Sequence, residues 1–250
     1  MLIPAGNPSL WTGPTGTNTY LLTGRVPALI DAGVGHSTHV DAVAAGLGGR
    51  DLDLVLLTHS HSDHASGVPA ILERWPRAVV RPAAAPLVDG CSIAAGDRTL
   101  TALHTPGHAP DHFCFLDGDA GEVYCGDLVR AGGTIVIPAS RGGDLRAYLG
   151  SLRRIRELRP KRLWPGHGAV IDNPDAIISE YVAHRAEREE QIVGALKRGL
   201  ATPSEIAADV YGKLPAVIRP AAADSVLAHL QKLVADGAVE IDDGRYVPRE

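Results

Sequence analysis

The sequence has few cysteines and no pattern that would pair them. Only three occur among 250 residues, at positions 91, 114 and 125. An odd number without paired spacing disfavours a disulfide framework and favours a reducing compartment. There is also no run of about 18 apolar residues, the length that a membrane-spanning helix needs. The opening MLIPAGNPSLWTGPTG holds Pro and Gly where a secretory signal would hold an apolar segment. We therefore expect a soluble, cytoplasmic protein without a membrane partner.

Positive charge is not in excess. There are 24 Lys and Arg against 29 Asp and Glu, which gives a formal net charge of −5. This balance disfavours a whole-surface nucleic-acid binder but allows a local basic patch. Hydrophobic residues make up 45% and charged residues 21%, which is typical of a globular protein. The length fits one large domain, or one domain with a small appendage.

Short apolar runs alternate with amphipathic segments along the first two hundred residues. We expect strands at 19–23, 28–31, 53–58, 78–80, 99–104, 112–116, 122–125 and 162–164. We expect helices over Ser37–Leu47, 65–74, 144–158 and 174–200, the third with Asp144 as its N-cap. This order predicts a layered α/β sheet protein.

The last fifty residues predict a separate small domain. Two helices, over Pro203–Tyr211 and 221–236, precede a hairpin over 239–247. Helix, helix and hairpin are the arrangement of a winged helix, so we divide the chain into domains of residues 1–200 and 201–250. The hairpin of this domain is acidic, and the second helix of the domain has a single Lys. Because contact with phosphates needs Lys or Arg, specific DNA binding is disfavoured.

The densest group of polar side chains is the run His59-Ser60-His61-Ser62-Asp63-His64. It follows a predicted strand and precedes a predicted helix, so we expect it on a strand-end loop, where side chains can converge. Neutral imidazole and carboxylate are zinc ligands. Four such groups cannot all bind one tetrahedral ion and leave room for a substrate, so the run predicts two metals.

Three further side chains follow predicted strands beside glycine. They are His108 in TPGHAPDH, Asp127 after VYCG, and His167 in PGHG. If one edge of the sheet carries them all, the set of five His and two Asp suffices for two metals with an Asp bridge. No Ser or Cys nucleophile is then required, and we expect Cys114 and Cys125 in the core.

These residues resemble the signature of the metallo-β-lactamase-fold hydrolase superfamily, HxHxDH with later His, Asp and His. The resemblance covers roughly residues 1–200 and implies an αββα sandwich with a dinuclear zinc site at one edge. It implies that His59, His61 and His108 hold the first metal, that Asp63, His64 and His167 hold the second, and that Asp127 bridges them.

A closer resemblance, to the β-lactamase-like protein 2 family, spans nearly the whole chain. The segments NPSLWTGPTGTNTYLL, RGGDLRAYLGSL, WPGHGAVIDNP and YVAHRAEREEQI carry it, together with the winged helix. Animal members are described as single-strand endoribonucleases, and related members in natural-product pathways are thioesterases. The resemblance implies two zinc ions per chain, although iron or manganese suits the same ligands. A metal-bridging hydroxide, oriented by Asp63, would be the nucleophile, with Asp127 as the catalytic bridge.

Single-stranded RNA is the first expected substrate, because eight Lys and Arg also gather between residues 141 and 162. The alternative is a thioester or ester, as in glyoxalase II, although the winged helix disfavours a glutathione thioester. An Asp at 127, near where Cys-bearing metallo-β-lactamases place a thiolate, leaves at most weak β-lactamase activity. A regulatory protein with a degenerate site is disfavoured by the complete ligand set.

Three more residues are candidates for the border of the substrate cleft: Asn18, Arg141 and His184. The favoured alternatives are turn chemistry for Asn18, a solvated surface for Arg141, and packing on a helix face shared with Tyr181 for His184. Apolar residues of the C-terminal domain would support a homodimer.

Overall fold

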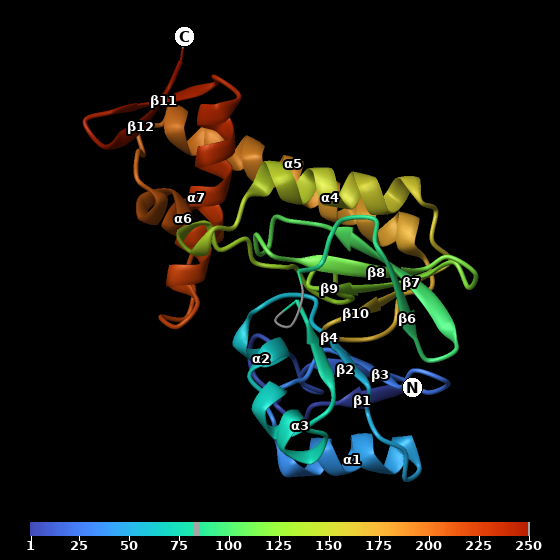
Figure 1. Cartoon of the computed structure of the whole chain (residues 1–250). Coiled ribbons are helices and arrows are strands. Elements are labelled where there is room, and N and C mark those ends of the chain that lie inside the picture. The colour runs from blue at the N-terminus through green and yellow to red at the C-terminus, as the bar shows by residue number, and fades with distance from the viewer. Residues whose placement is uncertain (83–85, 250) are drawn as a thin grey trace.

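The computed structural model describes residues 1–82 and 86–249, and its centre is a pair of five-stranded sheets (Figure 1). The first sheet has the order β1-β2-β3-β4-β5, with strands Leu2–Pro4, Asn18–Leu22, Ala28–Ile30, Leu54–Leu56 and Val79–Arg81. The second has the order β10-β9-β8-β7-β6, whose strands in chain order from β6 are Ser92–Ala95, Arg98–His104, Phe113–Asp117, Glu122–Gly126 and Arg162–Pro165.

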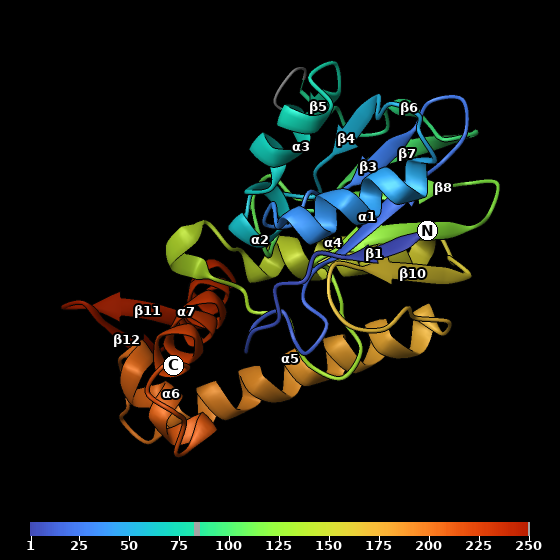
Figure 2. The same cartoon turned by 90° about the horizontal axis from the view of Figure 1, so that it is seen from below.

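Helices cover the outer face of each sheet (Figures 1 and 2). The first sheet carries α1 (Ser37–Leu47), α2 (Ser62–Ala65) and α3 (Val68–Arg74), and the second carries α4 (Leu145–Glu157) and α5 (Pro174–Lys197). Large apolar side chains such as Tyr20, Leu56 and Phe115 fill the space between the sheets. The expected αββα sandwich is confirmed.

A small C-terminal unit packs against the end of α5. It consists of α6 (Pro203–Tyr211), α7 (Arg219–Ala235) and a hairpin of β11 (Val239–Asp242) and β12 (Arg245–Pro248), as expected for a winged helix. Its core includes Ile192 and Leu196 from the last turns of α5. Tyr181, nearer the start of the same helix, packs into the core beneath the second sheet. None of the helices within 1–82 and 86–249 is long and apolar enough to cross a bilayer.

Several predicted elements differ from those observed. Strands β1 and β6 were not predicted, because each is only three or four residues long, too short for a clear periodic pattern. The helix expected over 65–74 begins later, at Val68, as α3, and the short helix α2 precedes it over Ser62–Ala65. Between them, a Cβ at Gly67 would lie 2.1 Å from the Ala32 carbonyl oxygen, so glycine permits a close approach to the loop after β3. Helix α7 begins at Arg219 rather than 221, with Pro220 in its first turn, where no amide hydrogen is needed.

Strand pairing gathers several loops at one end of the sandwich. Strands β9 and β10 run parallel and pair Gly126 with Pro165, so the loops that follow them emerge side by side. Strands β3 and β4 are also parallel, which places the residues after Ile30 beside those after Leu56. Helix α2 lies at this end, and the C-terminal unit flanks it (Figure 2).

Candidate metal centre

The His-Ser-His-Ser-Asp-His run crosses from a loop into a helix. Strand β4 ends at Leu56 and α2 begins at Ser62. His59 and His61 therefore lie on the loop, as expected, whereas Asp63 and His64 lie in α2, where the loop prediction was wrong. His59 and His61 join one candidate group and Asp63 and His64 another, while His59 and His64 also meet at Asp127.

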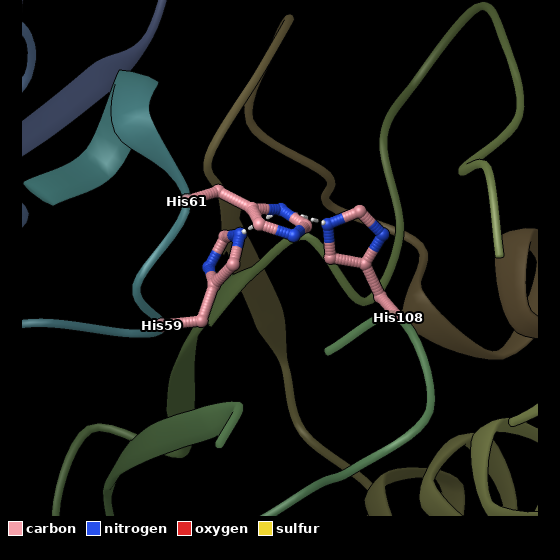
Figure 3. A group of neighbouring side chains, drawn as sticks. All are labelled: His59, His61 and His108. Carbon is pink, nitrogen blue, oxygen red and sulfur yellow. Dashed lines mark hydrogen bonds between the residues drawn. The ribbon is translucent and has the colours of Figure 1, made fainter. Parts of the chain in front are cut away.

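Three histidines form the first group (Figure 3). The Nδ1 atom of His61 lies 3.0 Å from His59 Nε2 and 2.9 Å from His108 Nε2. His108 donates its Nδ1 proton to the Val136 carbonyl at 2.7 Å, which leaves Nε2 with a free lone pair. Burial lowers the pKa of His59 well below its usual value and also lowers the pKa of His61. Both rings are therefore neutral at pH 7, the form that binds a cation.

Asp63, His64 and His167 form the second group. Oδ2 of Asp63 lies 3.1 Å from His167 Nε2 and 3.6 Å from His64 Nε2. Burial opposes protonation of His167, but Asp127 and Asp63 outweigh it and raise its pKa to about 9. The pKa of His64 is raised well above its usual value, because Asp31 and Asp127 overcome the effect of burial. Without a cation, these two histidines carry protons at neutral pH.

Asp127 lies between the two groups. Its Oδ2 is 3.5 Å from His108 Nε2, and its Oδ1 is 3.4 Å from both His64 Nε2 and His167 Nε2. Burial would raise the pKa of Asp127, but His167 and His64 hold it well below the usual value. One ionised carboxylate therefore presents one oxygen to each group.

Two buried polar atoms in and beside the second group lack a hydrogen-bond partner. His64 Nε2 and Asp127 Oδ1 are buried and make no hydrogen bond within the described part of the chain. A Cβ at Gly166 would lie 2.7 Å from Asp127 Oδ1 and 2.7 Å from His64 Cε1, so glycine keeps this space free of a side chain. Buried polar atoms are normally satisfied. A cation held by imidazole nitrogens and carboxylate oxygens would satisfy these atoms, so the residues fit a metal pair.

Two further side chains orient the ligand atoms, and sequence reasoning did not assign them this role. Asp31, held at a φ of 60°, accepts the Nδ1 proton of His64 at 2.8 Å. His112 accepts the Asp127 backbone N–H at 3.1 Å, and burial lowers its pKa to about 3. Asp31 offered the signal that was used for Asp127, an Asp directly after a strand and close to a glycine.

The three cleft candidates lie in different environments. Asn18 is only 2% exposed and donates both amide hydrogens to the loop around His167, at 3.0 Å to Pro165 O and 2.8 Å to Gly168 O. Arg141 is exposed on a short 3₁₀ helix, Ala139–Arg141. His184 is half-buried on α5 and lines a pocket of about 420 Å³ with Tyr181 and the 132–134 loop.

Four of the eight basic residues between 141 and 162 form ion pairs with acids. Arg146 pairs with Asp236, Arg154 with Asp89, Arg156 with Asp175, and Arg162 with Asp172 and Glu122. Half of the positive charge of the cluster is therefore neutralised locally. Cys114 and Cys125 are fully buried, and burial raises the pKa of the Cys114 thiol to about 12, so the expectation of core cysteines is confirmed.

The chain matches known families along most of its length. The Metallo-beta-lactamase superfamily matches residues 12–87 and 76–167, and the Beta-lactamase associated winged helix domain matches residues 202–245. A Beta-lactamase-like protein 2 homolog from Caenorhabditis elegans is 32% identical, over 90% of this chain and 81% of the relative. An Atrochrysone carboxyl ACP thioesterase from Aspergillus chevalieri is 34% identical, over 95% of this chain and 82% of the relative.

Solved structures show the same architecture. A metallo-beta-lactamase family protein from Thermus thermophilus superposes with a TM-score of 0.80 at 23% identity, over 100% of this chain and 98% of that one. A protein solved in a di-iron-bound form is 27% identical, with a TM-score of 0.56 over 70% of this chain and 98% of that one. The chain therefore belongs to the metallo-beta-lactamase superfamily of hydrolases and carries the winged-helix domain associated with it.

Proposed function

We propose that the chain is a dinuclear metal hydrolase that cleaves acyl thioesters. The observation that carries the dinuclear assignment is the position of Asp127, whose two oxygens face different histidine groups. His59, His61 and His108 would hold one cation, and Asp63, His64 and His167 the other. Bound there, two divalent cations would lower the pKa of a water molecule and polarise the scissile carbonyl.

The chain's own carboxylates have distinct roles in this proposal. Asp127 has a side chain only 10% exposed and fixes the spacing of the two groups, whereas the Asp63 side chain is 27% exposed. Asp63 is therefore the carboxylate that an attacking water can reach. The carboxylate oxygen of Asp63 that does not face His64 and His167 can accept a hydrogen bond from that water, orient the water toward the substrate carbonyl, and take its proton for transfer to the leaving thiolate.

Charge supports a thioester over the expected RNA. A single-stranded RNA groove needs unneutralised Lys and Arg along the backbone path. Half of the basic residues on which that expectation depended are paired with Asp or Glu, as described above. A relative with 34% identity is named as an acyl carrier protein thioesterase, which supports the same substrate class. Cleavage of single-stranded RNA stays a prediction, and the activity screen described next also tests it.

The test combines metal analysis with an activity screen on the wild type, Asp127→Ala and Asp119→Ala. Asp119 is an exposed carboxylate in the turn between β8 and β9, so it serves as the matched control. We expect about two zinc, iron or manganese ions per chain, and hydrolysis of an acyl thioester by wild type and control. Asp127→Ala should lose at least one ion and the activity. Two ions and full activity in Asp127→Ala would refute the dinuclear site. If the wild type cleaved single-stranded RNA and no thioester, RNA would take the place of the thioester as the substrate.

A further inference from the structure

The segment between Asp127 and α4 carries the backbone group that orients His108. The Val136 carbonyl accepts the Nδ1 proton of His108 at 2.7 Å. This bond fixes the ring tautomer and directs Nε2 toward His61 and Asp127. The position of Val136 therefore decides whether His108 presents its lone pair to the first group.

Residues 128–138 contain no helix or strand, so neighbouring elements hold this fully described segment in place. The Tyr148 hydroxyl donates to the Leu128 carbonyl at 2.6 Å. Tyr181 accepts from the Arg130 N–H and donates to the Arg130 carbonyl. The Arg185 guanidinium donates to Thr134 Oγ1 and to the Ile135 carbonyl. These anchors all come from α4 and α5, and they act on the part of the segment that precedes Val136.

On the other side of Val136, the Pro138 carbonyl accepts the N–H groups of Arg141 and Gly143, and a further anchor comes from the C-terminal unit. Asp224 of α7 accepts the backbone N–H of Ser140 at 2.8 Å on Oδ1 and its hydroxyl at 2.9 Å on Oδ2. Ala228, one turn further along α7, is 2% exposed and belongs to the same core cluster as Ile137. Helix α7 therefore holds the segment by two hydrogen bonds and by apolar packing, within four residues of Val136.

We propose that Asp224 is a positioning residue for His108, and that the winged-helix domain thereby completes the first metal group. The path runs from Asp224 through Ser140 and the short stretch to the Val136 carbonyl, and from there to His108 Nδ1. The inference rests on the proposed function, because it assumes that His108 is a metal ligand. Groups that orient a ligating histidine typically alter metal affinity by about 10- to 100-fold when removed.

The matched control is Asp236, at the other end of α7. It pairs with Lys232 of its own helix and with Arg146 of α4, so it also joins the C-terminal unit to the sandwich. Both of these partners lie outside the 128–142 segment. Asp236→Asn therefore tests whether general weakening of the domain contact is enough to disturb the site.

The experiment measures Zn²⁺ affinity by chelator competition, the imidazole ¹⁵N shifts of the metal-free protein, and kcat and KM for the thioester. It uses Asp224→Ala, Asp224→Asn, Ser140→Ala and Asp236→Asn. Asp224→Ala should weaken one Zn²⁺ about tenfold, reduce the Nδ1–H tautomer of His108, and lower kcat with little change in KM. Asp224→Asn, which keeps an acceptor, and Ser140→Ala, which keeps the backbone donor, should lie between it and the wild type.

Asp236→Asn should match the wild type in all three measurements. Wild-type Zn²⁺ affinity and an unchanged His108 tautomer in Asp224→Ala would overturn the positioning role while leaving the proposed function intact. An equal loss in Asp236→Asn would overturn it as well, because the effect would then come from domain docking in general. Failure of Asp127→Ala to lose metal would instead count against the proposed function itself. Ser140 is exposed, so Ser140→Ala is a folded test even if the Asp224 variants are unstable.

Discussion

His64 and Asp31 form a fully buried pair, with Nδ1 of the imidazole 2.8 Å from Oδ2 of the carboxylate. This contact fixes the ring so that Nε2 faces Asp63 and Asp127. Asp31 also accepts the backbone N–H and the hydroxyl of Thr58, so the loop that follows β4 is attached to the same carboxylate. Asp31 thereby fixes both the orientation of the His64 ring and the path of the loop that carries His59 and His61.

Changing Asp31 should separate its electrostatic role from its structural role. Asn tolerates the left-handed backbone and keeps an acceptor for Thr58, so Asp31→Asn should fold but bind one metal ion about 10- to 100-fold more weakly. Asp31→Ala leaves the Thr58 donors unpaired and strains the backbone, which should cost roughly 2 to 4 kcal/mol of unfolding free energy. Urea unfolding and Zn²⁺ competition measure the two effects. Equal metal affinity in Asp31→Asn and wild type would contradict the electrostatic role.

Metal uptake by the second group should release protons. Without metal, His64 and His167 are protonated at neutral pH, because nearby carboxylates raise the pKa of His64 and bring that of His167 to about 9. A cation must displace these protons, so the affinity of this group should rise with pH, about tenfold per unit for each proton, until about pH 9. The first group contains His59 and His61, whose pKa values are lowered, so its affinity should vary little above pH 7. Zn²⁺ competition at about pH 6, 7 and 8 should resolve one steep and one shallow dependence, and two shallow ones would contradict the protonation states.

Asn18 provides a test between a substrate contact and a loop anchor. Its two amide hydrogens both hold the loop that carries His167, so Asn18→Ala should free that loop. We expect weaker metal binding and a lower kcat, with KM little changed. A substrate contact would give the opposite pattern, a raised KM with unchanged metal content. Steady-state kinetics, together with Zn²⁺ affinities measured by chelator competition, distinguish the two patterns.

A buried histidine far from the ligand set should make stability depend on pH. His39 is 2% exposed and bonds to Thr19 Oγ1 at 2.8 Å, and burial, with a smaller effect from His36, lowers its pKa to about 4. The unfolded chain therefore binds this proton more readily between about pH 6.5 and pH 4. Stability should be highest above about pH 6.5 and should fall by about 2 kcal/mol near pH 5 from this group.

The His39→Gln variant isolates this contribution, because Gln keeps a side-chain donor for Thr19 but does not titrate. The difference in urea unfolding free energy between wild type and variant should shrink as pH falls from about 7.5 to about 5. A constant difference across that range would show that His39 does not become charged on unfolding.

The sequence predicted the candidate ligand residues better than it predicted their supports. The His and Asp set is recognisable because the residue types and their short spacing carry the chemistry directly, and the structure brings all seven together. The roles of Asp31 and Asn18 depend on partners 33 to 150 residues away, which no local pattern encodes.

The same contrast between local patterns and distant contacts holds for the fold. Helix α1 was placed to the residue, because its apolar spacing is a local property, and α5 begins at Pro174 as predicted but ends at Lys197 rather than 200. The short helix α2 was missed, since four residues are too few for a periodic pattern, and the close approach of Gly67 to the loop after β3 is a tertiary contact that no local pattern encodes. The arginine cluster looked unpaired in sequence because Asp89, Asp172, Asp175 and Asp236 come from other elements.

Helix α5 has a mechanical consequence. Its 24 residues run unbroken from the core beneath the second sheet into the core of the C-terminal unit, with Tyr181 in one and Ile192 and Leu196 in the other. The two units are therefore joined by a continuous helix and not by a flexible linker, and neither unit can rotate relative to the other unless the helix bends. Truncation after residue 200 would expose the apolar end of α5 to water. The full chain should therefore unfold in one cooperative transition, and neither unit should fold independently of the other.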